Sequence, residues 1–177
     1  MKIGQIWIET VLYTIIGLTL IGIALSIATP KINESRDRAI IEQTISSLGV
    51  WDERIGEVVD KGPGNKRTIP AFTMKHGELI INSTNDEILF VVGGLSKPYS
   101  EPGFEIRDGN VRIKSYLEGK SAYLVLKLSY ENIANITYAG AETEKKFTAS
   151  STAYSFSIAN LGGQPYTQID IEETSRR

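Results

Sequence analysis

The amino-acid sequence predicts an α+β protein in which a long N-terminal helix is followed by an antiparallel β-sandwich-like head domain. Two observations carry this prediction. The segment from Thr10 to Thr29 holds twenty consecutive residues without a formal charge, which suits a membrane-spanning helix. After Arg67, short alternating apolar and polar runs are separated by turn sequences, a pattern typical of antiparallel strands.

The composition excludes several classes of protein. The chain has 177 residues, with 21 acids against 19 bases, and its formal charge of -2 leaves no basic surface of the kind that nucleic-acid binders carry. It has no Cys, which excludes disulfides, thiolate metal sites and cysteine nucleophiles. Its one His makes histidine-based metal sites and acid–base catalysis poorly supported. We therefore expect no cofactor, no metal site and no nucleic-acid partner.

Residues 5–29 are predicted to form a transmembrane helix. At about 1.5 Å per residue, the uncharged run spans about 30 Å, the thickness of a bilayer core. Trp7 precedes the run, where an aromatic ring suits the membrane interface. One interpretation is a plain N-terminal anchor. A second is a cleaved secretory signal, for which residues 26–28 offer a small-x-small site.

A third interpretation rests on Met1-Lys2-Ile3-Gly4 and on Glu9, which stands five residues after Gly4. This N-terminus resembles that of a type IV prepilin over residues 1–60. The resemblance implies that residues 1–4 are a leader, which a prepilin peptidase cuts after Gly4 on the cytoplasmic side. Gln5 would then begin the mature chain. The apolar helix would stay in the product as the polymerisation segment.

The resemblance also implies a role for Glu9. In this family, the corresponding carboxylate is thought to pair with the N-terminal amine of a neighbouring subunit, here the amine of Gln5. Each charge is costly in an apolar setting, and pairing stabilises both. Gly17 and Gly22 are expected to loosen the helix for packing and bending during assembly. The implied partners are the membrane, other copies of the chain, the prepilin peptidase and the pilus assembly machinery.

Residues 30–61 are predicted to extend the helix. Pro30 is expected to kink or restart it, and Gly49 is a second candidate for a break or bend. Beyond Pro30, apolar residues recur at helical spacing with charges between them, which indicates an amphipathic helix. The sequence from Lys61 to Asn65, with two glycines and a proline, should end the helix.

Residues 67–177 are predicted to form the head, and turn sequences separate its strands. The predicted strands are Thr68–Met74, Glu78–Asn82, Ile88–Val92, Phe104–Arg107, Val111–Tyr116, Ala122–Tyr130, Ile133–Tyr138, Lys146–Ala149, Tyr154–Ala159 and Tyr166–Ile171. His76 falls in a predicted hairpin turn, where a solvated side chain is expected. No catalytic constellation is found, and we do not expect an enzyme.

Three Asn-x-Ser/Thr triplets begin at Asn33, Asn82 and Asn135. Such triplets are acceptor sites for N-glycans on exported proteins. Archaeal surface filaments are commonly N-glycosylated and often carry all-β heads, whereas mature bacterial type IV pilins usually begin with Phe where this chain has Gln5. These features favour an archaeal source.

Taken together, the sequence predicts a structural subunit of a type IV pilus-like surface filament that serves adhesion or surface contact. Archaeal flagellar filament subunits share this architecture but generally lack the acid, so Glu9 favours an adhesion-type pilin. The chain would start in the cytoplasmic membrane, as a single-pass protein with its N-terminus in the cytoplasm and its head outside. It would then join an extracellular filament. The alternatives are a monomeric membrane-anchored extracytoplasmic binding domain, and a minor pilin or pseudopilin of a secretion or uptake system.

Overall fold

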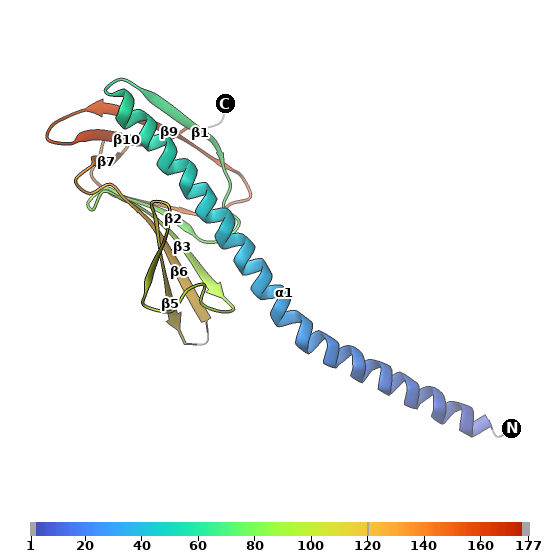
Figure 1. The fold of residues 1–177 in the computed structure, drawn as a ribbon. Coiled ribbons are helices and arrows are strands. Elements are labelled where there is room, and N and C mark those ends of the chain that lie inside the picture. The colour runs from blue at the N-terminus through green and yellow to red at the C-terminus, as the bar shows by residue number, and fades with distance from the viewer. Residues whose placement is uncertain (1–2, 120, 175–177) are drawn as a thin grey trace.

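The computed structural model describes residues 3–119 and 121–174, with side chains described from Trp7 onward. Its first element is helix α1, Ile3–Lys61, whose 59 residues make it about 90 Å long. The N-terminal half of α1 projects from the head as a rod, and the C-terminal half lies along the head (Figure 1). The predicted long helix is therefore confirmed.

Helix α1 runs without interruption through Pro30 and Gly49. The expectation of a break at either position is wrong. Proline removes one backbone donor and so one hydrogen bond of the helix. That loss is small among the many hydrogen bonds of so long a helix, and α1 curves only gently (Figure 1). Residues 5–29 and 30–61 thus belong to one helix. They differ in that the first part projects from the head and much of the second part lies along it.

The end of α1 lies where the sequence predicts it. Gly62 has φ +80°, a left-handed conformation that glycine adopts at little cost and that commonly ends helices. The side-chain amide of Asn65 then donates to the carbonyl oxygens of Lys61 at 2.8 Å and Gly62 at 3.0 Å. These bonds satisfy acceptors that a helix end leaves free.

Two sheets form the head, and all ten predicted strands are present with ends shifted by at most three residues. The four-stranded sheet has the order β1 Lys66–Phe72, β9 Tyr154–Gly162, β10 Thr167–Glu173 and β7 Ala134–Tyr138. The six-stranded sheet has the order β4 Glu105–Asp108, β5 Val111–Glu118, β6 Ser121–Ser129, β3 Glu87–Leu95, β2 Glu78–Asn82 and β8 Glu144–Thr148. The α+β class with a β-rich head is confirmed.

One strand pair departs from the antiparallel pattern. Strand β10 pairs with β7 in parallel, with Thr167 opposite Ala134 and Ile171 opposite Tyr138. A parallel pair needs a long connection. Here the chain leaves β7, passes through β8 in the other sheet and through β9, and only then enters β10. Local sequence patterns do not encode this return path.

The core of the head includes one face of α1, which packs against both sheets. The ring of Trp51 is completely buried and lies 5.8 Å from that of Phe72 on β1 and 4.9 Å from that of Phe156 on β9, measured between centroids. The buried apolar side chains of α1 recur every three or four residues, as one helical face requires. They are Ile41, Ile45, Leu48, Trp51, Ile55 and Val58.

Candidate functional site: the exposed half of α1 and its junction with the head

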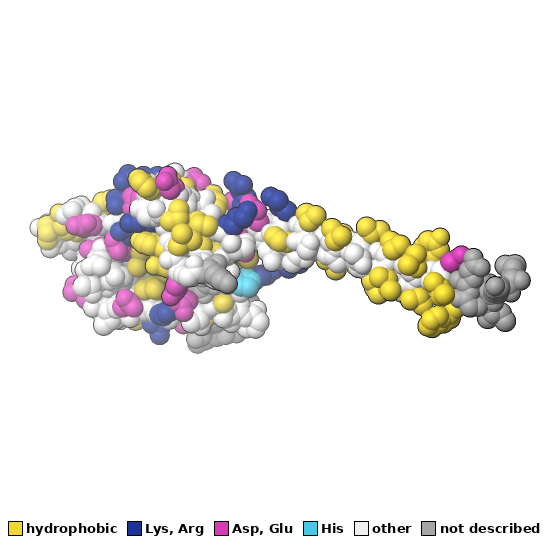
Figure 2. Space-filling view, turned by 90° about the horizontal axis from the view of Figure 1, so that it is seen from below, with side chains coloured by type: hydrophobic (Ala, Val, Ile, Leu, Met, Phe, Trp, Pro, Cys, Tyr) yellow, Lys and Arg dark blue, Asp and Glu magenta, His cyan; other side chains and the backbone are white. Residues whose placement is uncertain are grey.

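The N-terminal half of α1 exposes apolar side chains around its circumference. Trp7 is 72% exposed, Leu18 64% and Ile27 68%, and hydrophobic side chains lie along the length of the projecting rod in Figure 2. Apolar surface on this scale marks a site that lipid or another protein covers. The exposed large apolar side chains of this segment are Trp7, Ile8, Val11, Leu12, Tyr13, Ile15, Ile16, Leu18, Leu20, Ile21, Ile23, Leu25, Ile27 and Ile32.

This segment is long and apolar enough to cross a membrane, and none of its most apolar 18-residue window is buried against the head. A core helix of a soluble protein would be mostly buried. The helix is therefore compatible with a single-pass membrane anchor.

Three hydroxyl groups within the apolar half are satisfied inside the helix. Thr14 donates to the carbonyl oxygen of Thr10, Thr19 to that of Ile15 and Ser26 to that of Ile23, each at 2.8 Å. A polar group without a hydrogen bond is costly where water is absent. These back-bonds suit the segment to an environment without water.

Gly17 and Gly22 are not required by close contacts with other described residues of the chain. A Cβ atom built at either position meets nothing within 4 Å. Glycine inside a helix costs about 1 kcal/mol relative to alanine. The assembly role expected for these two glycines stays a prediction that concerns contacts outside this chain.

Glu9 lies at the start of the apolar half, and its side chain is exposed. It has no ion pair among the described residues. The backbone from Gly4 and Gln5 to Glu9 is helical, so Gln5 and Glu9 are about one turn, or 6 Å of rise, apart. The side chain of Gln5, and Met1 and Lys2 of the predicted leader, lie outside the part of the chain that is described.

Polar contacts begin to hold the head to α1 just beyond Pro30. Glu34 pairs with Lys97 at 3.0 Å and with Lys31 at 3.7 Å. The hydrogen bond from Lys97 and the charge of Lys31 lower the pKa of the Glu34 carboxyl. Asp37 accepts the backbone N–H of Ser96 at 2.8 Å and also the hydroxyl of Ser96.

Further along the helix, Asp52 links α1 to the six-stranded sheet. It accepts the hydroxyl of Tyr130 at 3.0 Å and the side-chain amide of Asn110 at 2.7 Å. Burial, followed by the charge of Asp52, raises the pKa of Tyr130, which therefore stays protonated as a donor. Asp52 thus holds the turn between β4 and β5 against the helix.

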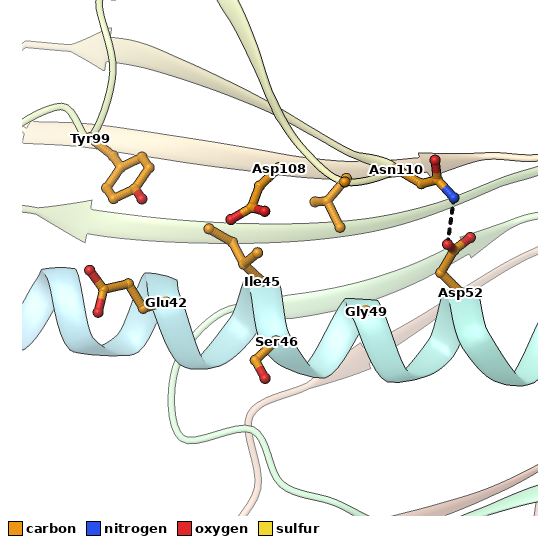
Figure 3. Close-up of a pocket in the computed structure, with 10 residues that line it drawn as sticks. Glu42, Ile45, Ser46, Gly49, Asp52, Tyr99, Asp108 and Asn110 are labelled. Carbon is orange, nitrogen blue, oxygen red and sulfur yellow. Dashed lines mark hydrogen bonds between the residues drawn. The ribbon is translucent and has the colours of Figure 1, made fainter.

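A cavity of about 740 Å³ lies between α1 and this turn. Figure 3 shows Tyr99 and Asp108 directed toward the helix from above, with the Asp52–Asn110 hydrogen bond at one end. The ten lining residues include the carboxylates of Glu42, Asp52 and Asp108 and the hydroxyls of Ser46 and Tyr99, and none of the ten is a His, Lys or Arg. Among the described residues, no group of three His, Asp or Glu side chains is placed to hold a metal ion.

The glycosylation triplets lie in three different settings. Asn33 is exposed on α1, and Asn82 is half-buried at the last position of β2. Asn135 is half-buried in β7, with its amide 3.4 Å from Glu142, and its triplet partner Thr137 is buried and donates to Asp170. Glycosylation at these asparagines stays a prediction. His76 is exposed between β1 and β2, as expected.

The structure brings together residues that the sequence analysis did not single out. Asn160 is buried on β9, where its side-chain amide donates to the carbonyl oxygen of Val58 on α1 at 2.8 Å. Its side-chain oxygen accepts Gly162 N–H at 2.8 Å and the hydroxyl of Thr167 at 2.6 Å. The sequence gives one local signal for Asn160. It is a polar residue directly after the predicted strand Tyr154–Ala159 and shortly before Gly162 and Gly163.

Comparison with known protein families, with characterised proteins and with solved structures finds no match to this chain.

Proposed function

We propose that this chain is a structural subunit of a type IV pilus-like surface filament. A prepilin peptidase cuts it after Gly4, and the mature chain polymerises through residues 5–29. The observation that carries the proposal is the apolar half of α1, which exposes apolar side chains around its circumference and is not covered by the head.

The position of Glu9 supports assembly over simple anchoring. A carboxylate at the edge of a lipid-facing helix is unfavourable, and no cation among the described residues pairs with it. An α-amino group on Gln5 of a neighbouring copy would supply the missing positive charge. Such a pairing would fix the axial register between copies, as single buried polar groups do in coiled coils.

The packing of the head on α1 supports a filament with heads outward. The face of α1 from Ile41 to Val58 is occupied by the two sheets. Contacts between the helices of neighbouring copies would therefore be made by the uncovered N-terminal half of α1. In the membrane, the N-terminus would lie in the cytoplasm and the head outside, and the filament would present the heads for adhesion. An archaeal source, and glycans on Asn33, Asn82 or Asn135, belong to the same proposal.

The first test identifies the N-terminal residue of the protein recovered from its native membrane, by peptide mass spectrometry. A mature chain that begins at Gln5 supports prepilin processing. A chain that begins at Met1 contradicts processing, and one that begins near Thr29 indicates a cleaved signal and a secreted domain.

The second test compares filament yield between Glu9→Ala and the control Glu53→Ala. Glu53 is also an exposed carboxylate of α1 and has no ion pair among the described residues. We expect Glu9→Ala to reduce filament incorporation with membrane insertion unchanged, and Glu53→Ala to resemble the native chain. Normal filaments from Glu9→Ala would exclude the proposed role of Glu9.

The second candidate function is a monomeric membrane-anchored binding domain. It is favoured by the same exposed apolar surface, because lipid alone can cover it, and by the hydroxyl groups satisfied within the helix. It predicts no filaments from the native chain or from either variant. A minor pilin or pseudopilin would instead assemble in few copies and would respond to Glu9→Ala.

A further inference from the structure

A row of cations crosses the outward face of β4, β5 and β6. Arg107 on β4 lies directly opposite Arg112 on β5, and Arg112 lies opposite Lys127 on β6. Arg112 alternates with the buried Val111 and Ile113, so the row is on the side of the sheet turned away from the core. This face carries four cations, Arg107, Arg112, Lys114 and Lys127, against Glu105, Glu118 and the Glu87 carboxylate that pairs with Lys127 from β3, which gives +1 in a chain of net charge -2.

The positive charge of this row is only partly neutralised within the chain. Like charges directly opposite one another on neighbouring strands are destabilising. Lys127 is paired with Glu87 at 2.8 Å, but Arg107 reaches only Glu105, at 3.8 Å. Arg112 has no ion pair or side-chain hydrogen bond among the described residues. The row therefore holds one guanidinium group without an ion pair in the described part of the chain, that of Arg112, and one with a single long ion pair, that of Arg107.

A pair of tyrosines continues the same face along β5 and β6. Tyr116 and Tyr123 are directly opposite, with ring centroids 4.9 Å apart and planes inclined by 9°. The Lys114 ammonium lies 5.4 Å from the centroid of Tyr116. Neither phenol hydroxyl has a side-chain hydrogen bond within the described part of the chain. The stack restricts both rings, so it presents two hydroxyls at low entropic cost.

We propose that the outward face of β4–β6 binds an acidic polysaccharide. Arg107 and Arg112 bind its carboxylate or sulfate groups, because a guanidinium matches such anions with two parallel hydrogen bonds. The hydroxyls of Tyr116 and Tyr123 bind sugar hydroxyls. Tyr116 is four positions beyond Arg112 along β5, a distance of about 13 Å. The site therefore fits an extended polymer that reaches from the two arginines to the two tyrosines rather than a single small anion.

The same face is poorly suited to a single-stranded nucleic acid. Such ligands bind by stacking bases on exposed aromatic faces. Tyr116 already has Tyr123 and the Lys114 ammonium against its ring. Two carboxylates lie near the arginines of the row. Asp52 and Asp60 of α1 line a cavity of about 400 Å³ together with Arg107 and Arg112. These carboxylates repel a phosphate backbone and the acidic groups of a polysaccharide alike, so the preference for a polysaccharide rests on the occupied tyrosine faces.

This proposal rests on the proposed function and names the class of ligand that the head would contact. The arrangement of the residues on β4–β6 does not depend on filament assembly. The test uses the full chain in detergent micelles, with no filament required. Oligogalacturonate is the probe, and its methyl ester is the uncharged control on the same sugar backbone. Binding is measured by isothermal titration calorimetry at two salt concentrations, with an oligothymidylate as the competing class of polyanion.

We expect oligogalacturonate to bind, its methyl ester to bind at least tenfold more weakly, and affinity to fall as salt rises. Arg112→Gln and Arg107→Gln should each weaken binding by about tenfold, since a hydrogen bond to a charged group is lost. Lys66→Ser is the matched control, because it removes a cation from the exposed start of β1 in the other sheet. It should leave binding unchanged.

A second measurement separates a ligand site from a structural one. Removing one cation of the row relieves repulsion between like charges, so Arg112→Gln should unfold at the same temperature as the native chain or a higher one. Tyr123→Phe, which removes only a hydroxyl, should also weaken binding. Any one of four results would overturn the proposal. These are no binding of oligogalacturonate, equal affinity for its methyl ester, equal or tighter binding of oligothymidylate, and an equal loss of binding in Lys66→Ser.

Discussion

Ser96, the residue directly after β3, donates both its backbone N–H and its hydroxyl to the carboxylate of Asp37 on α1. Beside it, Lys97 pairs with Glu34 at 3.0 Å. Residues 34–37 and 96–97, which we call the junction, mark the point at which α1 changes from a projecting rod into a packed part of the head. The orientation of the head relative to the rod depends on these few exposed polar contacts and on the core beyond them.

Asp37→Ala should loosen the junction without unfolding the head. The two lost hydrogen bonds are exposed, so the free energy of unfolding should fall by only about 1 kcal/mol. Amide hydrogen exchange of residues 34–40 should become faster, as measured by mass spectrometry. Glu53→Ala, which removes an exposed carboxylate from the same helix, is the control. Equal exchange in the two variants would mean that Asp37 does not hold the junction.

Acid should loosen the junction as well. The pKa of Glu34 is lowered in the folded chain, first by its hydrogen bond from Lys97 and then by the charge of Lys31. A carboxyl whose pKa is lowered by folding stabilises the fold above its unfolded pKa of about 4.3. That contribution is lost as the pH falls through the lower folded pKa.

We therefore expect hydrogen exchange at residues 34–40 to increase, relative to its intrinsic rate, as the pH falls below about 4.3. Glu34→Gln should reduce this pH dependence. Glu57, whose pKa is lowered chiefly by its hydrogen bond from Arg67, should keep its own response in that variant. A native pH profile in Glu34→Gln would assign the effect to another group.

The head should require the C-terminal half of α1 to fold. A fragment of residues 30–177 keeps the buried face from Ile41 to Val58 and should be a soluble, cooperatively folded monomer. A fragment of residues 62–177 lacks that face and should show no cooperative thermal unfolding by circular dichroism. A folded 62–177 fragment would show that the two sheets form a sufficient core by themselves.

Within the same face, Trp51→Ala should lower the free energy of unfolding by about 3–5 kcal/mol, because it leaves a cavity among Phe72 and Phe156. Val50→Ala is the neighbouring control, since Val50 is 41% exposed, and it should change stability little. Urea unfolding of the 30–177 fragment measures both. Similar losses in the two variants would contradict the packing described for Trp51.

Asn160→Ala should cost about 2 kcal/mol or more of unfolding free energy, because it leaves the buried carbonyl of Val58 without its donor. It also frees the turn at Gly162, whose N–H bonds to the same side chain. Gln43→Ala, at an exposed amide of α1, is the control in the same urea titration. A loss no larger than that of the control would show that water replaces the missing donor.

The periodicity of the sequence was enough to predict the elements of this fold, but not their partners. Every predicted strand is present, because alternation of apolar and polar residues is a local property. Parallel pairing of β7 with β10 depends on a return path through the other sheet, which no local pattern records. Pro30 gave a local signal for a kink, yet one missing hydrogen bond did not break a long helix.

The functional residues also divide into those that the sequence indicates and those that only the structure identifies. The apolar run and the interval from Gly4 to Glu9 can be read directly from the sequence, and the structure places that run on the exposed rod. The contacts of Asp37, Asp52 and Asn160 each join residues more than fifty positions apart. In the sequence, such residues look like ordinary surface charges or turn amides. Only the assembled sheets reveal them as attachment points.

The continuity of α1 has a mechanical consequence. The helix that projects from the head also supplies its central tryptophan and five other buried apolar side chains. A pulling force applied to the head therefore enters the rod through the interior of the domain and not through a flexible tether. To detach the head from its stem, tension would have to extract a core helix from between two sheets. The subunit should bear load as one piece until the head itself unfolds.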